Sequence, residues 1–142
     1  MANIQSHLNQ WVHNRSLLEH IPAKYPDWIV TVAFHTALQA VDALLAYDNV
    51  TVYSHDVRNT TRKQTNRYEF IWQHYNPLYD LSRKVRYLAA PAQWVKHQDI
   101  DKNVLRRYLY PIEKSVKTLT KETEWPSHHE IQLTAAYIPN PG

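Results

Sequence analysis

The chain has 142 residues, of which 44% are hydrophobic and 20% are charged, and its formal net charge is only +3. Its one glycine is the final residue, so the sequence holds no glycine-rich phosphate loop and no dinucleotide-binding fingerprint. Cysteine is absent, which excludes disulfides and thiolate metal sites in this sequence and agrees with a cytoplasmic location. Length and composition predict one all-α domain with a substantial core.

The first two predicted helices follow directly from the spacing of apolar residues. From Asn3 to His20 these residues recur at helical intervals, and Pro22 ends the pattern. The segment from Asp27, a suitable N-cap, to Tyr47 is apolar on nearly every side. One polar seam runs along it with spacings of four, four and three: Thr31, His35, Gln39 and Asp42. A lipid-spanning segment would not carry such residues at this depth, so we expect a buried central helix and no membrane contact.

Two further helices are expected after a loop that follows the central helix. Ser54 or His55 suits the start of a third helix, which runs to about Tyr75. Pro77 suits the first position of a fourth and shorter helix, which runs to about Leu88. The two helices are neighbours in sequence, and we expect them to lie side by side.

The last predicted helix begins after Asp99, a good N-cap, and extends to about Leu119. Pro111 lies inside it and is expected to kink it. Residues 122–142 lose helical periodicity, so this tail is either disordered or draped over the rest. The sequence therefore predicts an up-and-down bundle of four to five antiparallel helices over residues 1–121, followed by an irregular tail.

Charge is distributed unevenly along the third and fourth predicted helices. Between Arg58 and Arg86 the chain has seven cations and only two carboxylates, Glu69 and Asp80. Tyrosines are interleaved with the cations, a composition typical of surfaces that attract phosphate and stack bases. A solvated helix surface also needs charges, so the pattern leaves both interpretations open.

Three segments resemble the HEPN superfamily of small helical bundles: DWIVTVAFHTALQAVDALL, then SHDVR at a helix start, then YNPLYDLSRKVRY. The resemblance covers about residues 5–120. Its matching positions are Phe34, Ala37, Leu38, Ala40, Asp42, Ala43, Leu44, Ser54, His55, Asp56, Ser82, Arg83, Arg86 and Tyr87. It implies a homodimeric, HEPN-like bundle with a positively charged cleft and no cofactor or metal.

Members of this superfamily include metal-independent ribonucleases and noncatalytic partners of nucleotidyltransferases in toxin-antitoxin pairs. The nuclease branch carries an Arg followed by a His after four to six residues. Two pairs here have that spacing, Arg15 with His20 and Arg67 with His74. With eight arginines and nine histidines, one or two such pairs are expected by chance, so the spacing alone is weak support.

The resemblance and the charge pattern together select nine candidate site residues. The candidates for catalysis, by a neutral His as base and an Arg on the phosphate, are His55, Arg58, Arg67 and His74. The candidates for ligand binding are Arg62, Tyr79, Arg83, Arg86 and Tyr87. Three functions follow: a nucleotide- or RNA-binding domain using a basic cleft on the third and fourth helices, a metal-independent endoribonuclease, or a structural partner of a nucleotidyltransferase or other small protein.

Overall fold

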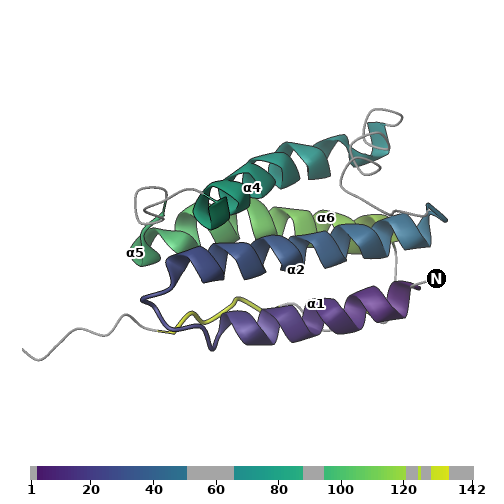
Figure 1. Ribbon diagram of the computed structural model, residues 1–142. Helices are drawn as coiled ribbons and strands as arrows, with labels where there is room; N and C mark the ends of the chain where they lie inside the picture. The colour runs from purple at the N-terminus through teal and green to yellow at the C-terminus, as the bar shows by residue number, and fades with distance from the viewer. Residues whose placement is uncertain (1–2, 51–65, 88–94, 121–124, 126–128, 135–142) are drawn as a thin grey trace, which may run out of the picture.

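The computed structural model describes residues 3–50, 66–87, 95–120, 125 and 129–134, and within these ranges it contains helices and no β-strand. Four long elements form the bundle: α1 (Ile4–Leu18), α2 (Pro26–Tyr47), α4 (Glu69–Tyr87) and α6 (Tyr110–Thr120). Three short elements precede α4 or α6: η1 (Asn66–Tyr68), α5 (His97–Ile100) and η3 (Asp101–Leu109). The predicted all-α helical bundle is confirmed for these residues (Figure 1).

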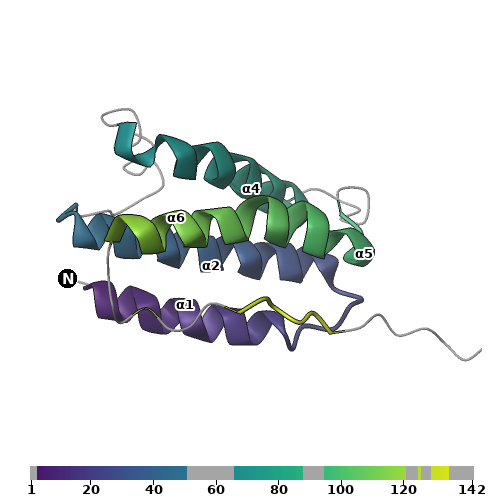
Figure 2. The ribbon, with the colours of Figure 1, turned by 180° about the vertical axis from the view of Figure 1, so that it is seen from behind.

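Helix α2 is the centre of the bundle. It lies between α1 and α4 in both views, and α6 packs against it as well (Figures 1 and 2). Ala33, Ala37, Ala40 and Ala43 are completely buried, and their small side chains allow the neighbouring helices to approach closely. By length and composition α2 is also apolar enough to cross a membrane, and 67% of its most apolar window is buried inside the bundle.

The start of α2 differs in detail from the prediction. The helix begins at Pro26, and Tyr25, not Asp27, occupies the N-cap without a capping side chain. Proline is favoured at the first helical position because the N–H that it lacks would have no partner there. Asp27 lies in the first turn, where its carboxylate complements the helix dipole.

Residues 69–87 form one α-helix with Pro77 inside it, so the predicted break between a third and a fourth helix is wrong. The proline ring lies on the exposed side of α4, as does Gln73, whose carbonyl loses its usual donor. Water can hydrate that carbonyl, which lets the helix continue. The described parts of the two predicted helices therefore lie end to end and not side by side.

The last helical run extends from His97 to Thr120 through α5, η3 and α6. It begins with Lys96 as N-cap, and Asp99 lies in its first turn instead of capping it. The disturbance expected from Pro111 takes the form of a π-helix on its N-terminal side. In this wider pattern the Tyr110 N–H donates to the Leu105 carbonyl, five residues back.

Part of the C-terminal tail packs against the bundle. Residues 129–134 run along α1 (Figure 2), where the Gln132 N–H donates to the Glu19 carboxylate and the Thr134 hydroxyl donates to the Glu19 carbonyl. Trp125 and Ile131 are buried in the core. Of the two alternatives for this tail, its described residues correspond to a segment draped over the bundle.

A buried ion pair joins α1 to α6 beneath this segment. Both Nη1–carboxylate distances between Arg15 and Glu113 are 3.0 Å, and the two residues are only 4% and 2% exposed. The Trp11 indole N–H donates to the same carboxylate at 2.6 Å, and Arg15 also donates to the His129 carbonyl. The network satisfies a charge that burial would otherwise penalise strongly.

Candidate functional site

The nine predicted site residues fall into three groups in the structure. His55, Arg58 and Arg62 lie outside the described residues. Arg67 and His74 lie at the N-terminal end of α4, in η1 and in the second turn of the helix. The remaining four occupy the C-terminal half of α4: Tyr79, Arg83, Arg86 and Tyr87. At about 1.5 Å per residue, Arg67 and Arg83 are separated by roughly 25 Å along the helix axis.

The C-terminal half of α4 brings four predicted ligand-binding residues onto one surface, which we call the α4 basic surface: Tyr79, Arg83, Arg86 and Tyr87. The spacing of four, three and one places them on one side of the helix. The Arg83 guanidinium carbon lies 5.8 Å from the Tyr79 ring centroid, and that of Arg86 lies 5.3 Å from the Tyr87 ring centroid. The Tyr87 side chain is 74% exposed. Two arginines held on aromatic rings, of which Arg83 is exposed, suit the recognition of phosphate.

Arg83 and Arg86 are held to different degrees. The Arg86 Nε donates to the Ser82 carbonyl at 3.0 Å. This hydrogen bond holds the guanidinium against the preceding turn of the same helix. Arg83 is exposed, and within the described residues its guanidinium contacts only the Tyr79 ring. A shallow cavity of about 200 Å³ adjoins it and is lined by Asp80, Lys84 and Tyr87. Arg83 therefore has more unused donors for an incoming anion than Arg86.

Arg67 holds three elements together. Its Nε donates to the Asp48 carboxylate at 2.8 Å, and its Nη2 donates to the Leu119 carbonyl at 2.9 Å. The Tyr68 hydroxyl donates to the same carboxylate at 2.6 Å, and burial followed by this hydrogen bond raises the Tyr68 pKa. These contacts connect the end of α2, the start of α4 and the end of α6. In this arrangement the Arg67 guanidinium stabilises the packing of these elements.

His74 and Arg67 are not brought together. The His74 ring packs against Phe70 at a centroid distance of 4.5 Å, and its Nδ1 lies 2.9 Å from the Phe70 carbonyl oxygen. The second pair with nuclease-like spacing is also separated, because Arg15 is buried against Glu113 and the His20 Nδ1 lies 2.8 Å from the Ser16 carbonyl oxygen. Neither pair forms a site in which a base and a phosphate-binding arginine face one substrate.

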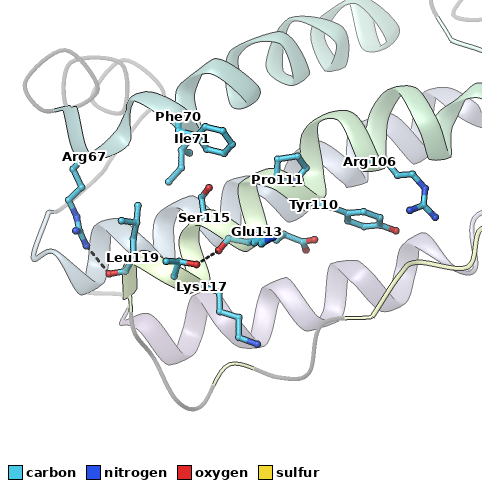
Figure 3. A pocket seen from close by; sticks show the side chains of 12 residues that line it. Arg67, Phe70, Ile71, Arg106, Tyr110, Pro111, Glu113, Ser115, Lys117 and Leu119 are labelled. Atoms are coloured by element: carbon cyan, nitrogen blue, oxygen red, sulfur yellow. Dashed lines mark hydrogen bonds between the residues drawn. The ribbon is translucent and has the colours of Figure 1, made fainter.

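A second surface was not predicted from the sequence. A groove of about 880 Å³ runs along the outward side of α6 and is bounded by the start of α4 (Figure 3). We call it the α6 groove and define it by six of its lining residues: Phe70, Ile71, Lys114, Pro111, Lys117 and Leu119. Four of these are apolar and two are exposed cations. The sequence carried a partial signal, since Pro111, Lys114 and Lys117 recur at helical spacing on the last predicted helix.

The polar residues of the α2 seam contact α1, α2 itself and α4. His7 of α1 lies with its Nδ1 2.9 Å from the Gln39 carboxamide oxygen. The Thr31 hydroxyl donates to the Asp27 carbonyl of its own helix. His35 is half-buried beside Phe34 and faces the positive charge of Arg86 on α4. The seam therefore contributes to helix packing, and its His35 lies next to the α4 basic surface.

Burial, and then the Arg86 charge, lower the pKa of His35 below its ordinary value of 6.5. In the window between that lowered pKa and 6.5 the unfolded chain binds more protons than the native chain, so stability rises with pH through the window and is unaffected above it. We expect His35→Gln to flatten this dependence in urea unfolding measured from about pH 5 to about pH 7.5. The exposed His13 provides the control, and equal flattening by His13→Gln would contradict the assignment.

Among the described residues no group of three His, Asp or Glu side chains is arranged to hold a metal ion. The described geometry offers cation and aromatic groups for binding, without an assembled base and nucleophile. Comparison with protein-family models, with curated proteins and with solved structures finds no match to this chain.

Proposed function

We propose that this chain is a phosphate-binding helical domain that binds nucleotide or single-stranded RNA at the α4 basic surface. The observation that carries the proposal is the pair of arginine–tyrosine contacts at 5.8 and 5.3 Å on one side of the helix. Arginine supplies planar donors for phosphate oxygens, and an exposed tyrosine supplies a ring on which a base can stack. The HEPN resemblance leads to the same ligand class from the sequence.

Electrostatics on the helix favour the same ligand. The last two turns of α4 contain Arg83, Lys84 and Arg86 against the single carboxylate of Asp80. Cations at a helix C-terminus also complement the helix dipole, which is a structural role that needs no ligand. The two roles predict different effects of removing Tyr87. An exposed aromatic ring does not interact with the helix dipole, but it can stack on a base.

The test is binding of a fluorescein-labelled single-stranded RNA, followed by anisotropy in the presence of EDTA. We expect Arg83→Ala to weaken binding by roughly tenfold and to reduce the slope of log K against log salt by about 0.7, the loss of one phosphate contact. Tyr87→Ala is expected to weaken binding by at least about fivefold through lost stacking, with little change in the salt slope.

Lys24→Ala is the matched control, because Lys24 also lies over an exposed tyrosine ring, 5.1 Å from the centroid of Tyr25. That pair lies in the connection between α1 and α2, outside α4. If Lys24→Ala and Arg83→Ala weaken RNA binding equally, the binding depends only on net charge, and this would contradict the proposed surface. EDTA-resistant cleavage of the RNA in the same samples would replace the binding proposal with the nuclease alternative.

A further inference from the structure

We infer that the α6 groove is a docking site for an acidic amphipathic helix of a different protein. This inference does not depend on the proposed phosphate-binding function, because the groove and the α4 basic surface share no residue. The apolar side chains of the groove, the charge at its rim and the shape that α6 gives it support the inference.

The wall that α4 contributes to the groove is apolar where it faces α6. Phe70 and Ile71 point from α4 toward the part of α6 that carries Pro111 and Ser115 (Figure 3). The Phe70 side chain is 50% exposed, and its packing against the His74 ring holds it in place. A large apolar side chain held at a half-exposed position beside another apolar side chain is a feature of protein-binding surfaces.

The rim of the groove is positively charged. Lys114 and Lys117 are exposed, and within the described residues neither ammonium group is in an ion pair. Glu113 is the only carboxylate among the described lining residues, and Arg15 neutralises it. The other lining cations, Arg67 and Arg106, already pair with Asp48 and with Asp101 and Glu130. The excess positive charge therefore comes from the two lysines, and it favours a negatively charged partner.

The shape selects a helix as the partner. The floor is α6 itself, an 11-residue helix of about three turns, and α4 forms one wall. A helix laid along α6 would place apolar residues at every third or fourth position on Phe70, Pro111 and Leu119, with acidic residues beside the lysines. A second copy of this chain is disfavoured, because a two-fold contact through this groove would bring two copies of the same positively charged rim together.

The test uses a fluorescein-labelled model helix roughly five turns long, with leucines on one face and glutamates flanking them. We expect it to bind the full chain, and we expect a peptide with lysines in place of the glutamates to bind at least about tenfold more weakly. The double variant Lys114→Glu/Lys117→Glu should reverse this preference. Phe70→Ser, a change at a half-exposed position, should weaken both peptides.

The matched control is Lys24→Glu/Lys102→Glu, which makes the same change in net charge at exposed positions outside the groove. It should leave the preference for the acidic peptide intact, as should Arg83→Ala, which tests the α4 basic surface alone. Equal binding of both peptides, or equal effects of the two double variants, would overturn the inference. Self-association in light scattering that Phe70→Ser abolishes would also overturn it, since the groove would then be a dimer interface.

Discussion

Replacing Glu113 with alanine is expected to lower the free energy of unfolding by about 3–5 kcal/mol, because it leaves the Arg15 guanidinium buried without a counter-charge. Arg15 is only 4% exposed. The same substitution removes the acceptor of the Trp11 indole N–H, which lies 2.6 Å from the carboxylate. A buried donor without an acceptor adds its own desolvation cost.

The measurement is urea unfolding followed by circular dichroism. Glu113→Gln provides a milder variant in case the alanine chain does not fold, since glutamine keeps an acceptor for Trp11 and removes only the charge. Arg15→Met combined with Glu113→Gln removes both charges and keeps that acceptor. We expect the double variant to recover most of the lost stability, because a buried pair contributes little when both partners are replaced together.

Arg106 supplies the control, because it makes equally short contacts at the surface. Its Nε–Asp101 and Nη2–Glu130 distances are 2.8 and 2.6 Å, but these side chains are about half exposed. Arg106→Ala is expected to cost much less than Glu113→Ala, because solvent screens an exposed ion pair. If the alanine variants of Glu113 and Arg106 lower the free energy of unfolding equally, the buried network stabilises the contact between α1 and α6 no more than a surface ion pair would.

The helices themselves were largely predictable from the sequence, because their apolar residues repeat every three to four positions. The exceptions have local causes that the pattern does not contain. Pro77 is usually a helix breaker, but on the exposed side of α4 its missing hydrogen bond is left to water, so one helix forms where two were expected. The π-helix before Pro111 preserves the same apolar stripe, and hydrophobic spacing alone does not distinguish it from a kink.

The candidate sites also differ in whether local spacing in the sequence predicts them. Tyr79, Arg83 and Arg86 were predictable as a group, because residues four and three apart on one helix share a face wherever that helix packs. The α6 groove was not predictable, because it combines Phe70 of α4 with residues of α6 that are about forty positions later. The pairing of Arg15 with Glu113 spans 98 positions, and no local pattern in the sequence indicates it.

A substitution in the C-terminal tail is also expected to lower stability strongly. Trp125→Ala should lower the free energy of unfolding by about 3–5 kcal/mol. Trp125 is only 7% exposed, its ring meets that of Trp11 edge-on at 5.0 Å, and its indole N–H donates to the Thr120 hydroxyl at 2.9 Å. Trp125→Phe keeps an aromatic ring there but loses the hydrogen bond and some area, so we expect a cost of about 1–2 kcal/mol. Both values come from urea unfolding followed by circular dichroism.

Trp28 is the natural control, since it is the same residue type on the first turn of α2 but is 57% exposed. Trp28→Ala should cost less than about 1 kcal/mol, as expected for a surface substitution. If the two alanine variants are equally stable, Trp125 contributes no packing and the folded domain ends near residue 121, as the loss of helical periodicity suggests. If Trp125→Ala alone is costly, the non-helical segment stabilises the contact between α1 and α6, and the folded domain continues beyond residue 121.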